Sequence, residues 1–199
     1  MHIILSTRNV RKATEIQAIF SNSPFTVVTL EEAGIEGKAL EDGASEEENA
    51  LKKARFAHER APDTWVMADD TGFAINALNG EPGRHAAYWA GENVPTEDTT
   101  RFCLEKMAGV IDRTATFKAV AVAISPSGEE FIFVGELRGS LLEAPRVTPL
   151  PQMPYGCLFV PTGETRSLAE MNVEEENKVS HRGIAFAKLR AFLEKRVRE

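Results

Sequence analysis

Short apolar segments typical of β-strands alternate with helical segments along this chain, and this alternation restricts the fold more than any other sequence feature. Residues 3–5 are apolar and precede a helical pattern over residues 10–20, and residues 25–30 then have the pattern of a second strand. Ser45 followed by Glu48 has the spacing of a capping box and predicts the start of another helix. Strands and helices in this order indicate an α/β fold.

The second half of the chain predicts a sheet that is not wholly parallel. Residues 117–124 and 131–137 have strand patterns and flank Pro126-Ser127-Gly128, which favours a hairpin. Residues 141–154 contain four prolines, so we expect an irregular loop there. Further helices are expected around residues 101–107 and along the apolar stripe of Leu189, Phe192 and Leu193.

Size and composition favour one large domain, residues 1–199, because a chain with 43% hydrophobic content can bury a substantial core. No segment reaches membrane-spanning length and the start lacks a signal-peptide pattern, so we expect a cytoplasmic protein with no membrane partner. Cys103 and Cys157 are too few for a disulfide framework and are expected to be reduced packing residues. The net charge of -7 argues against a duplex nucleic acid partner, while a small anionic ligand remains compatible with it.

Two adjacent carboxylates, Asp69 and Asp70, follow the apolar run of residues 65–67 and precede Thr71 and Gly72. At the end of a buried strand such a pair is costly unless a cation or hydrogen-bond donors offset its desolvation and repulsion. A divalent metal site is one interpretation, and a turn with Asx-type hydrogen bonds is the other. Successive side chains of a strand point to opposite faces, so the two aspartates need not have the same role.

The junction between the first predicted strand and helix, residues 6–12, combines helix-terminal amides with three cationic side chains. A helix that begins here presents unpaired amides and its positive dipole end, and Arg8, Arg11 and Lys12 add charge. This pattern fits a phosphate-binding loop, although the glycines of a Walker loop are missing. A simple helix cap, formed by the side chain of Thr7 or Asn9, is the alternative.

Residues 180–183, Ser-His-Arg-Gly, lie at the predicted start of the last helix. Arg182 offers a planar set of donors for a phosphate or a base carbonyl, and His181 can donate or accept. The simpler alternative is that Ser180 caps the helix and the next two residues are solvated.

Together, these clusters resemble the inosine triphosphate pyrophosphatase family in order and spacing. The matching segments span almost the whole chain and are residues 7–12, 41–43, 48–55, 68–72, 82–83 and 180–183. The resemblance implies an α/β fold with a central mixed, twisted sheet, two lobes around an active-site cleft, a homodimer, and Mg²⁺ as the cofactor.

The resemblance also implies roles for individual residues. Asp70 corresponds to the general base, with Asp69 in support; Glu41 and Asp70 lie near the metal, and Lys53 balances the carboxylates. The nucleotide-binding residues that it implies are Thr7, Asn9 and Lys12 for the triphosphate, Thr71 for a hydroxyl contact, and His181 and Arg182 for the base. A donor from Arg182 favours the carbonyl of hypoxanthine or xanthine over the amino group of adenine.

Several departures from the family pattern fall around the base pocket. Residues 153–156 read Met-Pro-Tyr-Gly where the family has Phe-Gly-Tyr-Asp, so only Tyr155 remains there to meet the base. Glu176 stands in place of a family lysine, and Lys178 lies close enough to replace it in part. Residues 86–88 read Ala-Ala-Tyr where the family has Ser-Ala-Arg.

The leading hypothesis is therefore Mg²⁺-dependent hydrolysis of non-standard purine nucleoside triphosphates to monophosphate and pyrophosphate, with an altered base preference. One alternative is a pyrophosphatase for a modified or pyrimidine nucleotide, as in the Maf-like proteins. The other is a nucleotide-binding protein without catalysis.

Overall fold

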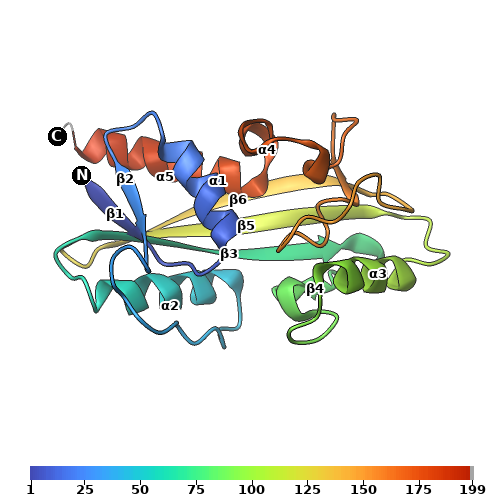
Figure 1. Cartoon of the computed structure of the whole chain (residues 1–199), viewed down its shortest axis with the longest axis horizontal. Coiled ribbons are helices and arrows are strands. Elements are labelled where there is room, and N and C mark those ends of the chain that lie inside the picture. Colours follow the sequence, from blue (N-terminus) through green and yellow to red (C-terminus); the bar gives the residue numbers. More distant parts are fainter. Residues whose placement is uncertain (198–199) are drawn as a thin grey trace. The chain divides into compact units, whose positions relative to one another are not determined.

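The computed structural model describes residues 1–197 as alternating strands and helices (Figure 1). In chain order the elements are β1 (His2–Leu5), α1 (Val10–Phe20), β2 (Thr26–Thr29), α2 (Glu46–His58), β3 (Trp65–Ile75), the 3-10 helix η1 (Asn76–Leu78), β4 (Pro82–Gly83), the 3-10 helix η2 (Ala86–Tyr88), α3 (Thr96–Lys106), β5 (Thr114–Ile124), β6 (Glu130–Leu141), β7 (Phe159–Pro161), the 3-10 helix η3 (Leu168–Glu170), α4 (Val173–Val179) and α5 (His181–Arg196).

The strands form a mixed sheet in the order β2-β1-β3-β5-β6-β7, with β4 paired to β3. β1 is parallel to both β2 and β3, whereas β4 pairs antiparallel with β3, and β7 does so with β6. The predicted mixed sheet and α/β class are confirmed, and β5 and β6 are neighbours joined by a short turn, as the hairpin pattern predicted.

The chain divides into two compact units, and β3, β5 and β6 contribute residues to both. The first unit comprises Met1–Asp70, Ala119–Gly135 and the residues from His181 on; the second comprises Thr71–Lys118 and Glu136–Ser180. The single domain and the cleft expected from the sequence stay predictions.

In the first unit the sheet is buried on both faces. Helices α1 and α5 lie side by side over one face and α2 covers the other (Figure 1). The alternation of side chains along β5 supplies both cores: alanines at 119, 121 and 123 pack under α1 and α5, while Val120, Val122 and Ile124 pack with α2. A strand buried on both sides reads as a continuous apolar run, which is the pattern of residues 119–124.

The same alternation explains the placing of the two aspartates on β3. Met67 packs in the core under α1 and α5, and Ala68 packs in the core with α2. Asp69 therefore continues the face of Met67, and Asp70 continues the face of Ala68. The expectation that this stretch ends a strand or forms a turn is wrong, because β3 continues without interruption to Ile75.

Two helix starts agree with the caps read from the sequence. Asn9 is the N-cap of α1, and its side chain accepts a hydrogen bond from the amide of Lys12. Ser45 is the N-cap of α2 and accepts from the amide of Glu48, whose carboxylate in turn accepts from the amide of Ala44. The caps fix where each helix begins and hence which of its side chains face the sheet.

Helix α3 begins at Thr96, earlier than the predicted start at Arg101. Its first turn contains Glu97 and Asp98, which favour a helix N-terminus but carry no apolar periodicity to reveal it. The start of α5 at His181 agrees with the sequence, and Ser180, directly before it, is the C-cap of α4.

The second unit has its own aromatic core. The ring of Phe73 lies 4.3 Å from that of Phe117 and 4.6 Å from that of Tyr155, measured between centroids. Cys103 and Cys157 are buried free thiols in this core, as expected from their number and spacing. Residues 142–149 form no helix or strand, which confirms the predicted proline-rich loop.

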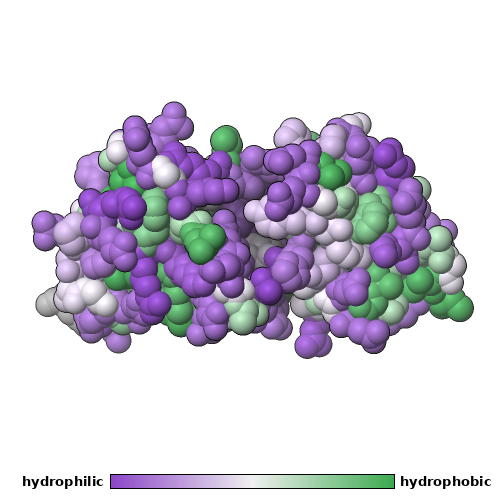
Figure 2. Space-filling view, turned by 90° about the horizontal axis from the view of Figure 1, so that it is seen from below, coloured by the Kyte–Doolittle hydropathy of each residue, from purple (hydrophilic) through white to green (hydrophobic). Residues whose placement is uncertain are grey.

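Among residues 1–197, no helix combines the length and apolar composition that a membrane span requires. The face of the first unit that carries α2 is mostly hydrophilic, with small separate apolar spots (Figure 2).

Candidate functional site

A buried ion cluster forms where α1, β3 and α5 of the first unit meet. The Nζ atom of Lys12 lies 3.0 Å from Oδ2 of Asp69, and Nε of Arg182 lies 3.3 Å from the same oxygen. Both Asp69 and Arg182 are buried. Burial opposes ionisation of Asp69, but the charges of Lys12 and Arg182 outweigh it and hold the pKa of this carboxyl well below its usual range.

The cluster extends from Arg182 to a second buried carboxylate, Glu15 on α1. Nη1 of Arg182 donates to Oε2 of Glu15, and Nε of Arg11 lies 2.8 Å from Oε1 of the same side chain. Arg11 is thereby directed along α1 toward Glu15, one helical turn away. His181 is also buried, and this burial, together with the charge of Arg182, lowers the pKa of its imidazole well below its usual value, so the ring is neutral at pH 7.

A second cluster lies on the opposite face of β3, beneath α2. Nζ of Lys53 is 2.6 Å from Oδ1 of Asp70 and 3.0 Å from Oε2 of Glu41. Burial raises the pKa of Asp70 in spite of the nearby positive charge of Lys53. Burial also acts against the charged form of Lys53, but Asp70, Asp69 and Glu41 outweigh it and raise the pKa of the ammonium.

Asn49 on α2 joins Asp70 to the loop that carries Glu41. Its Nδ2 atom lies 3.4 Å from Oδ2 of Asp70, and its Oδ1 atom accepts from the amide of Gly43 at 2.8 Å. A Cβ atom at Gly43 would lie 2.7 Å from Oδ1 of Asn49, so this close approach requires glycine. The loop is therefore tied to the same helix that supplies Lys53.

The junction between β1 and α1 is held by its own hydrogen bonds. Ser6 Oγ donates to the carbonyl of Lys53 at 2.7 Å, and the amide of Asn9 donates to Oγ1 of Thr7 at 3.2 Å. The guanidinium of Arg8 donates to the backbone carbonyls of Ile35 and Gly37. The capping role considered for Asn9 is thus observed, while phosphate binding by this loop stays a prediction.

The donor set in the second cluster suits Mg²⁺. This ion takes hard oxygen ligands and is commonly held by one or two carboxylates together with substrate phosphates. Glu41 and Asp70 supply two such carboxylates, brought close enough to share one lysine ammonium. No group of three or more His, Cys, Asp or Glu side chains in residues 1–197 has the arrangement of an all-protein metal site.

Three of the predicted nucleotide-binding residues belong to the second unit. Thr71 follows Asp70 on β3, and Lys178 is exposed in the last turn of α4. Tyr155 is buried, and its hydroxyl donates to the carbonyl of Ala86 at 2.6 Å. Burial also raises the pKa of this phenol. Glu176 is buried although Lys178 is exposed, which agrees with the different directions of helical residues two positions apart.

Gly156 and Met153, the two departures beside Tyr155, fit together in the second unit. A Cβ atom at Gly156 would come within 2.4 Å of Cε and 2.6 Å of Sδ of Met153. The methionine side chain thus occupies the space that any larger residue at position 156 would need.

Sequence reasoning missed three residues that organise the clusters: Ser6, Glu15 and Asn49. Glu15 stands four positions after Arg11, a helical spacing that favours an ion pair and is a usable signal. Asn49 lies within a segment matched to the family but carried no assigned role. The hydrogen bond from Ser6 reaches a backbone carbonyl far along the chain, which no local pattern indicates.

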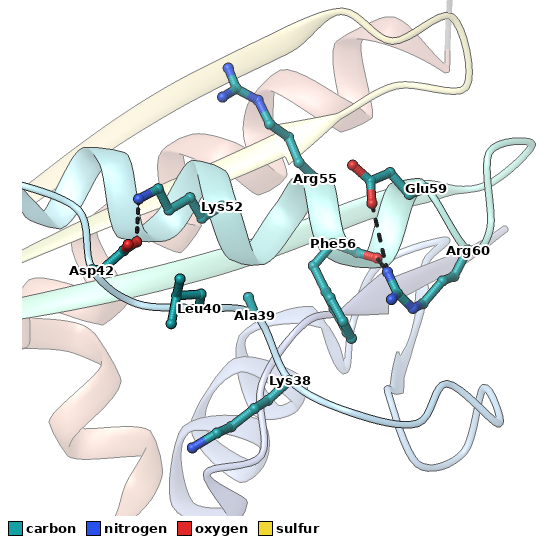
Figure 3. Close-up of a pocket in the computed structure, with 9 residues that line it drawn as sticks. All are labelled: Lys38, Ala39, Leu40, Asp42, Lys52, Arg55, Phe56, Glu59 and Arg60. Atoms are coloured by element: carbon teal, nitrogen blue, oxygen red, sulfur yellow. Dashed lines mark hydrogen bonds and ion pairs between the residues drawn. The ribbon is translucent and has the colours of Figure 1, made fainter.

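An open pocket of about 560 Å³ lies beside the loop before α2 (Figure 3). Most of its charged side chains are paired: Lys52 Nζ lies 2.5 Å from Asp42, Arg55 Nε lies 2.6 Å from Glu130, and Arg60 Nη1 lies 3.7 Å from Glu59. The lining residues are Lys38, Ala39, Leu40, Asp42, Lys52, Arg55, Phe56, Glu59 and Arg60, and neither aspartate of β3 is among them.

Known proteins match this chain over nearly its full length. The family model described as the Ham1 family matches residues 3–192. A dITP/XTP pyrophosphatase from Caldanaerobacter subterraneus subsp. tengcongensis is 37% identical over 201 residues, covering 100% of this chain and 99% of that protein. One from Geobacter sulfurreducens is 38% identical over 193 residues, covering 96% of each.

Solved structures agree with these matches. The Ham1 protein of Staphylococcus aureus has a TM-score of 0.82 at 31% identity, over 98% of this chain and 100% of that one. A nucleoside-triphosphatase / dITP/XTP pyrophosphatase from Mycobacterium abscessus has a TM-score of 0.71 at 34% identity, over 95% and 98% of the two chains.

Proposed function

Because the chain belongs to the Ham1 family, we propose that it hydrolyses non-standard purine nucleoside triphosphates to the monophosphate and pyrophosphate. Relatives at 37% and 38% identity over almost the full length are dITP/XTP pyrophosphatases, which supports inosine and xanthosine nucleotides as the substrate class. The observation that carries the proposal is the placing of Asp69 and Asp70 on opposite faces of β3 with different partners. Lys12 and Arg182 bind Asp69 and lower its pKa, whereas Asp70 is bound by Lys53 and its pKa is raised by burial.

In this proposal Asp70 is the general base. A carboxylate with a raised pKa is better matched to accepting a proton near neutral pH than an ordinary aspartate. Asp70 takes a proton from water as the water oxygen attacks the α-phosphorus. The bond from this phosphorus to the oxygen that bridges the α- and β-phosphates breaks, and pyrophosphate leaves with the bonding electrons. Lys53 keeps its proton and orients the carboxylates of Asp70 and Glu41.

Glu41 and Asp70 are the residues that would hold Mg²⁺. When bound, this ion supplies positive charge at the phosphate oxygens. Lys12 and the amides at the start of α1 favour the negative charge of the triphosphate, and Asp69 holds Lys12 in place. Arg182 has two of its nitrogens bound to Glu15 and Asp69, so its contribution to base binding in this proposal comes from the rest of the guanidinium.

We also propose that the base preference differs from that of the family. The support is the coupled pair Met153 and Gly156, because methionine fills the space where the family pattern has a carboxylate. A modified or pyrimidine nucleotide, as in the Maf-like proteins, is the second candidate substrate class and rests on this same departure. The homodimer is a proposal from family resemblance, and light scattering on the purified protein tests it. The cytoplasmic location is a proposal from the sequence pattern.

The experiment is a panel of nucleoside triphosphates assayed for pyrophosphate release. It includes the inosine, deoxyinosine, xanthosine, adenosine, guanosine, cytidine and uridine triphosphates, each with Mg²⁺ and with excess chelator. We expect turnover of the inosine and xanthosine nucleotides with weaker discrimination against the other bases than the family pattern implies, and no turnover with the chelator. No pyrophosphate from any member of the panel would exclude the proposal, and a preference for a pyrimidine would favour the second candidate.

A further inference from the structure

Arg8 links two loops of the first unit through backbone carbonyls. Its Nη2 atom donates to the carbonyl of Ile35 at 2.7 Å and to that of Gly37 at 2.9 Å, and its Nε atom lies 3.3 Å from the carbonyl oxygen of Gly37. A guanidinium can bind two carbonyls at once because its donors form a rigid planar fork. The Arg8 side chain is thus hydrogen-bonded to the segment after β2, although Arg8 belongs to the loop expected to bind phosphate.

The segment that Arg8 holds leads directly to Glu41. The end of this segment next to α2 is held by two hydrogen bonds. The amide of Gly43 donates to the side chain of Asn49, and the amide of Ala44 donates to the side chain of Glu48. No helix or strand is present between the two ends, so Glu41 lies on an irregular stretch anchored at both sides. Removing one anchor should widen the range of positions that the Glu41 carboxylate samples.

We propose that Arg8 is a positioning residue for Glu41, and that it holds the loop of residues 35–43 so that this carboxylate faces Asp70 and Lys53. Lys53 contacts both carboxylates, and Ser6, two residues before Arg8, contacts the backbone of Lys53. The loop after β1 therefore contacts the backbone of Lys53, and the Glu41 loop contacts its side chain. The role of Glu41 toward the metal rests on the proposed function, whereas the effect of Arg8 on the loop does not.

The first test measures the loop without any ligand. Lys38 is exposed inside the held segment, so the rate at which the lysine-specific protease Lys-C cuts after it reports how often that segment opens. We expect faster cleavage in Arg8→Ala and an intermediate rate in Arg8→Lys, because an ammonium lacks the planar fork. Mass spectrometry separates the cut at Lys38 from the new cut at position 8 in the lysine variant.

Arg60→Ala is the matched control. Arg60 also donates to a backbone carbonyl, that of Phe56 at 2.7 Å, and it lies close to the same segment without a role in either ion cluster. We expect its cleavage rate after Lys38 to equal that of the unmodified protein. Equal rates in Arg8→Ala and the unmodified protein would overturn the inference.

The second test measures Mg²⁺ binding by calorimetry in the absence of nucleotide, and the Mg²⁺ concentration for half-maximal activity. Loss of a residue that orients a ligand typically weakens metal binding by 10–100-fold, and because Arg8 acts through the loop we expect about tenfold. The KM for nucleotide at saturating Mg²⁺ should stay unchanged. A raised KM with unchanged metal binding and cleavage would instead identify Arg8 as a direct phosphate contact and overturn the inference.

The two tests separate this inference from the proposed function. If the unmodified protein releases no pyrophosphate from any triphosphate, the proposed function fails, while the cleavage rates still decide whether Arg8 holds the loop. If the protein is active but Arg8→Ala changes neither cleavage nor Mg²⁺ binding, the function stands and the role of Arg8 is disproved.

Discussion

Asp69 and Asp70 are consecutive on β3, yet each carboxylate is bound by a lysine from a different helix. Oδ2 of Asp69 lies 3.0 Å from Nζ of Lys12 on α1, and Oδ1 of Asp70 lies 2.6 Å from Nζ of Lys53 on α2. The alternation of side chains along a strand sends the two groups to opposite faces of the sheet. Their surroundings shift the two pKa values in opposite directions, which is the arrangement expected when adjacent carboxylates have different tasks.

Replacing Asp70 by asparagine should abolish turnover while preserving the fold. Loss of a positioned general base typically lowers kcat by about 10²–10⁴-fold. Stability should change little, because burial already disfavours the charged form of Asp70 and Lys53 retains Glu41 as a partner. The measurements are pyrophosphate release and urea unfolding, with Asp98→Asn on α3 as the control that keeps full activity. Full activity in Asp70→Asn would disprove its role as the base.

Replacing Asp69 by asparagine should instead destabilise the protein. The change leaves the partly buried Lys12 and the buried Arg182 without this carboxylate, and breaking a buried ion pair typically costs about 3–5 kcal/mol. Asp98→Asn again serves as the control, since it breaks an exposed pair with Arg101 at 2.6 Å, for which about 0–1 kcal/mol is expected. Urea unfolding at pH 7 gives both values, and equal losses in the two variants would contradict the burial argument.

The two aspartates should affect the pH dependence of stability with opposite signs. The pKa of Asp69 is lower in the folded protein than its ordinary 3.8. At a pH between the folded and the ordinary pKa the unfolded chain binds the proton, so stability falls as the pH is lowered through this range. The pKa of Asp70 is higher in the folded protein than 3.8. At a pH between the ordinary and the folded pKa the folded chain binds the proton, so stability falls as the pH is raised through this range.

Unfolding free energies across this pH range check the signs. Compared with the unmodified protein, Asp69→Asn should lose less stability below pH 3.8, and Asp70→Asn should lose less stability as the pH rises above 3.8. The same sign of change in both variants would show that the two carboxylates do not have the contrasting environments described.

Met153 and Gly156 should behave as a coupled pair. Gly156→Asp alone is expected to destabilise by about 1–3 kcal/mol, because its Cβ atom would overlap the methionine side chain. Adding Met153→Ala should recover part of this loss, and only the double variant should shift the nucleotide panel toward inosine and xanthosine triphosphates. A double-mutant cycle of unfolding free energies measures the coupling. Additive stability changes would mean that the two side chains do not compete for the same space.

Sequence patterns predicted the helices and strands well where neighbouring residues alone determine the structure, as in helix caps and apolar runs. Asn9 and Ser45 are caps that also mark the helix starts, and the apolar run over residues 119–124 marks a strand buried on both faces. The start of α3 was missed because its first turn is polar. The strand through Asp69 and Asp70 was predicted to end there, since adjacent carboxylates and a following glycine are unfavourable in a strand unless cations compensate for them.

The sequence by itself determined the α/β class, the succession of elements and which carboxylates and cations were candidates for the site, because these follow from periodicity, caps and residue chemistry. Only the tertiary structure decided which lysine pairs with which aspartate, since Lys12 and Lys53 reach β3 from helices on opposite faces. The tertiary structure also shows that Glu15 pairs with Arg182 and that Asn49 binds the amide of Gly43. It shows that Arg8 donates to a backbone carbonyl, that of Ile35. Such pairings join residues far apart in the chain, and their geometry depends on how the elements pack rather than on any local pattern.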